Sequence, residues 1–320
     1  MNFKFEKRKR KVIAYLKHIF ILLAMFLKRD KVNYKNKKII FMIESKDGRS
    51  HGLADKLKGI ITIFDMSNLL NISFYIHWTY PVDIKNYLLP HKINWNIEDN
   101  EIIRDNSKAF KIDFTTDGGL NYYEKLIKII NALNKYEQVH VFSNSRQTTK
   151  KEYRNYFKAL FKPTDKLQSA IEFHLREIGC DFVSVTFRFQ QLLGDFEEGG
   201  YPTLPKHEQD TLIDKCITHL QNIKKENQKY KKILVTSDSI TFLSIASKLD
   251  FVYVISGKRA HFGHNPYESV DVYLNSFIDY YLLTFSKCIF IVVEKGMYNT
   301  GFPKSAAYLG GTKVKVIKNL

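Results

Sequence analysis

Residues 183–195, VSVTFRFQQLLGD, carry the strongest indication of the fold. The first half of this stretch is rich in Val, Thr and Phe and alternates in polarity, a pattern typical of a β-strand. Arg188 stands where this strand would run out into a loop. In α/β proteins ligands bind at the carboxyl ends of the strands, and Arg binds phosphate through two nitrogen atoms at once. The stretch therefore predicts a nucleotide diphosphate site, although an Arg in an ordinary surface ion pair would give the same pattern.

Strand-like and helix-like segments alternate on both sides of this stretch. We expect strands at residues 39–44, 72–78, 138–142, 181–188, 232–236, 251–255 and 288–293. We expect helices at residues 53–70, 121–133, 208–225, 240–248, 270–285 and 303–308, and two more within 150–178. This alternation predicts an α/β fold of two Rossmann-like domains facing a cleft, at residues 39–178 and 179–320.

The composition fits a globular protein with two domains of ordinary size. The 320 residues are 44% hydrophobic and 14% aromatic, enough to build two apolar cores. Cys180, Cys216 and Cys288 lie far apart and form no C-x-x-C pair. The sequence therefore favours buried thiols in a reducing compartment over a disulfide framework or a zinc site.

The positive charge is concentrated in residues 1–38. This segment holds thirteen Lys and Arg residues and two acidic residues, so it carries +11 of the net charge of +17. Because the rest of the chain has no basic motif interleaved with aromatic residues, nucleic acid is not an expected partner.

An apolar run at residues 12–27 lies between basic clusters at 7–11 and 28–31. Lys17 and His18 interrupt the run, and the remaining stretch is shorter than the roughly 20 apolar residues that span a bilayer. No A-x-A cleavage pattern follows it. We expect an amphipathic helix on an anionic membrane, at the cytoplasmic face of a bacterial plasma membrane. A helix packed on the body of the protein would also explain the apolar run.

Two further strand ends in the second half carry polar residues. Ser237 and Asp238 follow the strand at 232–236, and residues 297–303, MYNTGFP, follow the strand at 288–293. A carboxylate accepts hydrogen bonds from a ribose or a base, and backbone amides at a helix start bind anions. Ser and Asp also cap helices, and Gly and Pro also mark turns. Together with Arg188, however, these residues predict one nucleotide-binding edge.

The order of these motifs resembles the donor domain of the α1,2/α1,6/protein-O-fucosyltransferase superfamily. The resemblance lies in FRFQQLLGD, then VTSD, then CIFIVVEKGMYNTGFPKSAA, and residues 48–56, GRSHGLADK, are similar to the glycine-rich loop that opens the family's first helix. The resemblance covers about residues 39–317. It implies a GT-B fold, with a GDP-sugar as donor substrate held mostly by the second domain and no further cofactor.

The resemblance also implies roles for individual residues. Arg188 would contact the donor β-phosphate, and Asp238 would help to hold the nucleoside. The other implied donor-binding residues are Asp195, Ser237, Thr300, Gly301 and Phe302, and Gly52 and Lys56 belong to the loop near donor and acceptor. The sequence departs from the family pattern at Ala54, Asp55, Lys56, Thr186 and Phe189.

The resemblance implies an inverting glycosyltransferase that moves fucose from GDP-fucose, and with a membrane-bound N-terminal segment we expect a surface glycan or lipid-linked oligosaccharide as acceptor. No D-x-D pair for a metal is present, and Arg188 would stabilise the leaving diphosphate. Asp55 and His51 are candidate general bases, although helix capping and loop structure explain them equally well. Because the sequence departs from the family pattern, a different nucleotide sugar remains an alternative donor. A non-catalytic membrane- or nucleic-acid-binding protein with an α/β scaffold remains the alternative.

Overall fold

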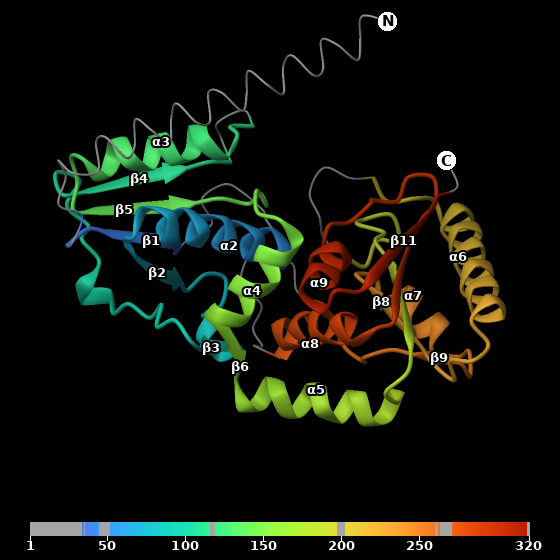
Figure 1. Ribbon diagram of the computed structural model, residues 1–320. Coiled ribbons are helices and arrows are strands. Elements are labelled where there is room, and N and C mark those ends of the chain that lie inside the picture. The colour runs from blue at the N-terminus through green and yellow to red at the C-terminus, as the bar shows by residue number, and fades with distance from the viewer. Residues whose placement is uncertain are drawn as a thin grey trace, which may run out of the picture.

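The computed structural model describes residues 34, 36–44, 52–115, 119–196, 202–259, 262 and 271–318. The strands in these ranges form two parallel sheets and one short antiparallel pair. Figure 1 shows the two parallel sheets side by side, with helices around each. The predicted membrane-binding segment and its basic flanks lie outside the described residues.

The first sheet has the strand order β2-β1-β5-β4, and all its strands are parallel. Its strands are β1 (Lys38–Ile43), β2 (Ser73–Trp78), β4 (Ala109–Asp113) and β5 (Gln138–Phe142). The helices α2 (Leu53–Leu70) and α3 (Tyr122–Leu133) and the short 3-10 helices η1 (Ile84–Asn86) and η2 (Asp99–Glu101) accompany it. β1 is a central strand with Ile39, Ile40 and Phe41 fully buried, as expected for a parallel strand covered on both faces.

Helix α2 approaches the end of β5 closely because of one glycine. A Cβ atom at Gly59 would overlap the carbonyl oxygen of Ser143, which follows β5. The absence of a side chain therefore lets the first turns of α2 lie against the loop after β5. Both segments consequently reach the same edge of the first sheet.

The second sheet has the strand order β11-β10-β7-β8-β9 and is also parallel. The strand that precedes Arg188 is its central strand, β7 (Val183–Phe187), and all five of its residues are buried. The neighbouring strands are β8 (Ile233–Ser237), β9 (Val252–Tyr253), β10 (Cys288–Val293) and β11 (Lys313–Lys318). The helices are α6 (Lys206–Glu226), α7 (Ile240–Ala246), α8 (Asp271–Phe285) and α9 (Phe302–Gly310).

Two helices join the sheets. α4 (Lys150–Leu160) packs against α2 and α9, and α5 (Asp165–Ile178) packs against α8 and runs across the bottom of Figure 1. Between them, β6 (Phe161–Pro163) pairs with β3 (Leu88–Pro90). The buried hydroxyl groups of Tyr153 and Tyr280 lie 2.9 Å apart and link α4 to α8.

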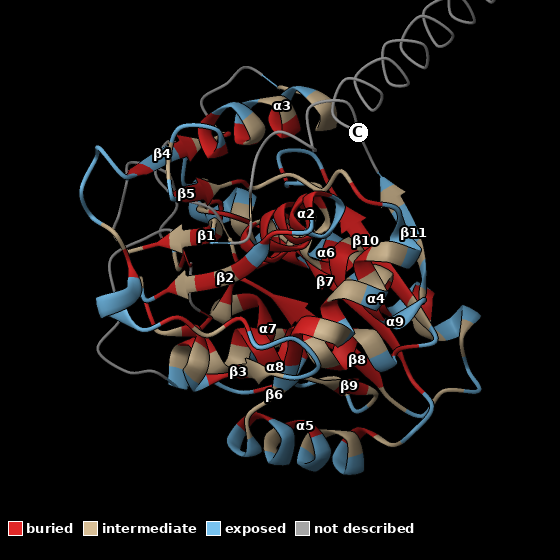
Figure 2. Ribbon diagram, turned by 60° about the vertical axis from the view of Figure 1, so that its left-hand side comes forward, coloured by how far each residue is buried: buried red, intermediate tan, exposed pale blue. Residues whose placement is uncertain are grey.

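Burial follows this arrangement. Figure 2 shows buried residues along the strands and on the inward helix faces, and exposed residues on the outer faces of α3 and α5. One cluster of buried apolar side chains extends through both parallel sheets. In the described part of the chain, every helix is too short or too polar to cross a bilayer.

All the predicted strands and helices in the described regions are present, with small shifts at their ends. The sequence prediction missed β3, β4, β6 and β11, and it made β9 too long. Cys216 is buried as expected, whereas Cys180 is exposed, and no disulfide joins the three cysteines. The first sheet draws its strands from residues 38–142 and the second from residues 183–318.

Candidate functional site

A cavity of about 810 Å³ lies where the carboxyl ends of the two parallel sheets meet. It is lined by the start of α2, the loop after β5, the ends of β7 and β8, and the loop before α9. Five cationic side chains (Lys58, Arg146, Arg188, Arg259 and Lys304) and three carboxylates (Asp55, Asp238 and Asp279) are among its lining residues. The cavity therefore suits an anionic ligand with polar groups.

Arg188 enters this cavity directly after β7. Its Nη1 atom lies 3.2 Å from Oδ2 of Asp238, and its guanidinium carbon lies 4.6 Å from the ring centre of Phe196. The side chain of Arg188 is 19% exposed. The guanidinium is thus held between a carboxylate and an aromatic face while it still reaches the cavity.

Asp238 lines the same wall but is almost completely buried. Its Oδ1 atom accepts the backbone N–H of Phe189 at 2.9 Å, and its Oδ2 atom accepts that of Gln190 at 2.7 Å. Burial raises the pKa of the Asp238 carboxyl, and the Arg188 guanidinium and the two amides act in the opposite direction. The carboxylate thus ties the end of β8 to the turn after β7.

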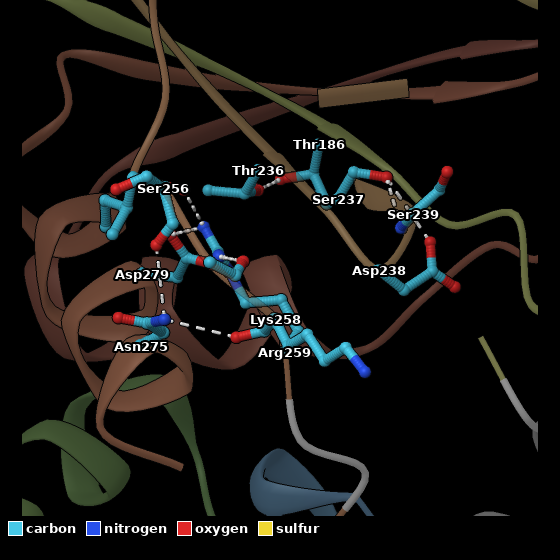
Figure 3. Close-up of polar contacts among 12 residues, drawn as sticks. Thr186, Thr236, Ser237, Asp238, Ser239, Ser256, Lys258, Arg259, Asn275 and Asp279 are labelled. Atoms are coloured by element: carbon cyan, nitrogen blue, oxygen red, sulfur yellow. Dashed lines mark hydrogen bonds and ion pairs between the residues drawn. The ribbon is translucent and has the colours of Figure 1, made fainter. Parts of the chain in front are cut away.

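The neighbouring serines organise the turn into α7, as Figure 3 shows. Ser237 lines the cavity, and its hydroxyl accepts the backbone N–H of Ser239 at 3.1 Å. Ser239 caps α7 by accepting the N–H of Phe242. The cap of α7 is therefore Ser239, the residue after Ser237 and Asp238, for which the sequence had left capping open.

Asp195 lies away from the cavity wall. Its Oδ2 atom accepts the hydroxyl of Ser239 at 2.8 Å and the backbone N–H of Thr241 at 2.7 Å. Asp195 is not among the lining residues. The structure therefore places this predicted donor-binding residue beside the start of α7, where it accepts one backbone N–H of the first turn.

The third strand end brings a helix N-terminus to the cavity. Thr300, Gly301 and Phe302 line it, and the Thr300 hydroxyl accepts the backbone N–H of Phe302 at 3.2 Å. Lys304, in the first turn of α9, donates to Asn299 at 2.7 Å. Burial lowers the pKa of Lys304, and the nearby Lys318 and Lys58 ammonium groups lower it further. This corner is therefore strongly positive.

Helix α2 faces this corner from the first sheet. Lys58 forms an ion pair with Asp55, with Nζ and Oδ1 2.6 Å apart, and both line the cavity. The Lys58 ammonium lies 3.5 Å from the position that a Cβ atom on Gly301 would occupy. Gly52, the N-terminal cap residue of α2, also lines the cavity. His51, the other predicted base, lies outside the described residues.

Lys56, two residues before Lys58, points into the protein instead. Its ammonium donates to the carbonyl oxygen of Phe262 at 2.9 Å and lies 5.8 Å from the ring centre of Trp78. Burial lowers the pKa of Lys56 to about 8. Lys56 is not among the lining residues. Its contacts connect α2 to the segment after β9.

The sequence prediction missed the ion pair between Arg259 and Asp279. The Arg259 Nε atom lies 2.5 Å from Asp279 Oδ2, and the guanidinium also donates to the carbonyl oxygens of Ile255 and Gly257. Burial raises the pKa of the Asp279 carboxyl, opposed by Arg259. Figure 3 shows this pair beside the ends of β7 and β8. No motif surrounds Arg259, so only the packing of α8 reveals it.

Arg146, in the loop after β5, is another lining residue that the sequence did not indicate. Its guanidinium carbon lies 4.6 Å from the ring centre of Tyr308, and its Nη1 donates to the carbonyl oxygen of Thr148. A loop Arg outside any motif gives no signal in one sequence.

One group of side chains in the described residues has metal-ligand spacing. Candidate ligand atoms of Glu44, His77 and Asp99 lie within 4.8 Å of one another. Arg104 forms ion pairs with both Glu44 and Asp99, at 2.7 and 2.8 Å. None of the three candidate ligands lines the cavity.

Comparisons with known proteins identify the fold. No family model and no curated relative matches the sequence. The structure is similar to NodZ α-1,6-fucosyltransferase soaked with GDP-fucose, at 12% identity over 86% of this chain and 92% of that chain, with a TM-score of 0.56. It is also similar to a mutant of Arabidopsis thaliana FUT1 in complex with GDP, at 11% identity over 88% and 70% of the two chains, with a TM-score of 0.55. A further NodZ structure, from Bradyrhizobium, has 13% identity over 85% and 91% and a TM-score of 0.53.

The GT-B fold expected from the sequence is therefore confirmed. The chain shares the fold of fucosyltransferases along most of its length. The resemblance seen in the motifs thus extends to the arrangement of the two sheets.

Proposed function

We propose that this protein is a glycosyltransferase of the fucosyltransferase type, with a GDP-sugar as donor and GDP-fucose as its preferred form. The observation that carries the proposal is the position of Arg188, at the carboxyl end of the central strand and inside a cation-rich cavity. Of the solved structures with this fold, one is in complex with GDP and another was soaked with GDP-fucose. The cavity offers a diphosphate several charge-assisted contacts.

The cations suit the chemistry of this reaction. When the bond between sugar and diphosphate breaks, negative charge grows on the diphosphate oxygens. Arg188, Lys58 and the amides at the start of α9 are positioned to stabilise that charge. We propose transfer without a metal ion on this basis.

We also propose that the acceptor binds on the side of the first sheet. In an inverting transfer, the acceptor hydroxyl attacks the anomeric carbon from the face opposite the diphosphate, and a general base removes its proton. Asp55 lies at the start of α2, and its ion pair with Lys58 already engages its carboxylate. Asp55 and His51 are the two candidate bases, and Asp55 must leave its ion pair with Lys58, a cation proposed for the diphosphate, before it can act on the acceptor. A surface glycan or a lipid-linked oligosaccharide is the proposed acceptor.

A membrane location completes the proposal. The basic flanks of residues 12–27 would hold the enzyme on the anionic cytoplasmic face of a bacterial plasma membrane. The full-length chain should sediment with anionic vesicles and lose this property when the basic residues at 7–11 are replaced by Glu. Sedimentation unchanged by that replacement would exclude the charge-based anchor.

The donor is tested by calorimetry with GDP, UDP, dTDP and CMP. We expect GDP to bind, and we expect Arg188→Ala to reduce its affinity at least tenfold, because the variant loses a charged phosphate contact. Arg176→Ala, on the exposed face of α5, is the matched control and should bind GDP normally. Binding of none of the four nucleotides would refute the enzyme proposal.

Catalysis is tested separately from binding. Purified protein incubated with GDP-fucose should release GDP, slowly with water and faster with a suitable glycan. If the protein binds GDP but releases none from GDP-fucose with any class of acceptor, the non-catalytic alternative would be favoured.

A further inference from the structure

Asp238 makes contacts that a nucleoside-binding carboxylate would not need. Oδ1 accepts the N–H of Phe189 and, at 3.4 Å, the hydroxyl of Ser237. Oδ2 accepts the N–H of Gln190 and lies 3.2 Å from Nη1 of Arg188. An ionised carboxylate accepts about four hydrogen bonds. Groups of the protein itself therefore already occupy the hydrogen-bonding positions of Asp238.

The turn held by these contacts has an unusual backbone. Gln190 has a φ of 55°, in the left-handed region that side-chain-bearing residues rarely adopt. The residue is also buried. Such a conformation persists only where the surrounding structure enforces it. The hydrogen bond from the Gln190 amide to Asp238 is one contact that does so.

We propose that Asp238 is a positioning residue, which presents the Arg188 guanidinium to the diphosphate of the donor. This inference rests on the proposed function and assigns Asp238 a role different from nucleoside binding. Asp238 acts on Arg188 in two ways, through the ion pair and through the two amides that follow Arg188 in the chain. Phe196 supports the guanidinium on its ring face.

The physical benefit is pre-organisation. A free Arg side chain has many rotamers, and fixing it when the ligand binds costs entropy. Asp238 fixes it beforehand, in a cavity where the guanidinium remains accessible to phosphate.

The test compares GDP with guanosine, using Asp238→Asn in the full-length chain. The Asn amide group places a donor where the carboxylate accepted one, so the turn and the ion pair are both disturbed. We expect GDP affinity, measured by calorimetry, to fall about tenfold to a hundredfold. Guanosine affinity should stay unchanged, because guanosine has no phosphate. An equal loss for guanosine would overturn the inference in favour of nucleoside contact.

A double-mutant cycle separates positioning from general stabilisation. If Asp238 acts through Arg188, Asp238→Asn should have little effect on GDP affinity once Arg188 is replaced by Met. A loss of the same size in both backgrounds would overturn the inference.

Ser239→Ala is the matched control for a loosened β8–α7 turn. It removes the α7 cap next to Asp238, and Ser239 is not a lining residue. It should lower the melting temperature and leave GDP affinity unchanged. A loss of GDP affinity equal to that of the Asp238→Asn variant would refute the positioning role. If the Asn variant does not fold, Asp238→Glu keeps the charge but displaces the carboxylate, and unchanged GDP affinity in the folded Glu variant would also refute it.

These outcomes distinguish the two proposals. If the wild type binds GDP and the Asp238→Asn variant binds it equally well, only the role of Asp238 is rejected and the proposed function stands. Failure of the wild type to bind GDP rejects the proposed function, and the role of Asp238 with it.

Discussion

Two Arg–Asp pairs face the same cavity, and they differ in how the guanidinium is used. Arg259 contacts Asp279 through Nε and Nη2 and also donates to two carbonyl oxygens. Arg188 meets Asp238 through Nη1 at 3.2 Å, while the same carboxylate accepts two backbone amides. In the first pair the carboxylate and the carbonyls fix the arginine into the fold. In the second, the carboxylate supports a turn that carries the arginine into the cavity.

The same contrast appears between two lysines on α2. Lys56 is buried and donates to Phe262, whereas Lys58 lines the cavity opposite α9. Residues two positions apart on a helix lie on nearly opposite faces. One lysine therefore connects the two halves of the protein, and the other lies at the cavity, where it pairs with Asp55.

The largest expected effect comes from breaking the structural pair. Arg259→Met leaves Asp279 buried without its cation, which costs about 3–5 kcal/mol of the free energy of unfolding. Urea denaturation followed by circular dichroism measures this loss. The double variant Arg259→Met/Asp279→Asn should recover most of it, because no buried charge remains. A single variant as stable as the wild type would show that the pair is not structural.

Lys56 is expected to make stability depend on pH. Its pKa of about 8 in the folded protein lies below the 10.5 of a free lysine, so the unfolded chain binds more protons between these values. The stability that Lys56 contributes is therefore highest above pH 10.5 and falls by about 3 kcal/mol as the pH drops to 8. The free energy of urea unfolding of the wild type minus that of Lys56→Met, measured from pH 7 to 10.5, isolates the contribution of Lys56. A flat difference across that range would contradict the buried position of the ammonium.

Lys58 is expected to affect binding more than stability. Lys58→Met should weaken GDP binding about tenfold, because it removes a cation facing the start of α9. The effect should shrink at high salt, where charges at a partly exposed site are screened. Lys158→Met, an exposed lysine on α4 that does not line the cavity, is the control. Equal GDP affinity in both variants would remove Lys58 from the binding site.

Gly301→Ala gives the smallest effect. The added methyl group would meet Lys58 at an ordinary contact distance of 3.5 Å, and the φ of Gly301 is −83°, which alanine adopts freely. We therefore expect the melting temperature to stay constant. GDP affinity should fall severalfold, because a donor that approaches the backbone at the start of α9 would meet the added methyl group. Unchanged GDP affinity would indicate that the donor does not approach the backbone at the start of α9.

The fold was largely predictable because the buried strands are apolar runs between helical patterns. β10 (CIFIVV) is a continuous apolar run and β8 (ILVTS) begins with one, whereas β7 (VSVTF) alternates in polarity although all its residues are buried. β4 and β11 were missed for the opposite reason. Both are edge strands, and β11 reads KVKVIK, with lysines of the kind that protect an exposed edge.

The site was only partly predictable. Arg188, Ser237, Asp238 and residues 300–302 line the cavity because they lie at or just after the ends of parallel strands, whose carboxyl ends meet at one edge. Lys58, Arg146 and Arg259 were missed because nothing near them in the sequence forms a motif. Their importance depends on which elements pack across the cavity.

The sequence by itself determined the alternation of strands and helices and the presence of Arg188 at a strand end. These features depend on local residue patterns, which a single chain displays directly. Only the tertiary structure decided which charged residues build the protein and which face the ligand. That choice depends on burial and on contacts between segments distant in the chain, such as the turn after β7 and the carboxylate after β8.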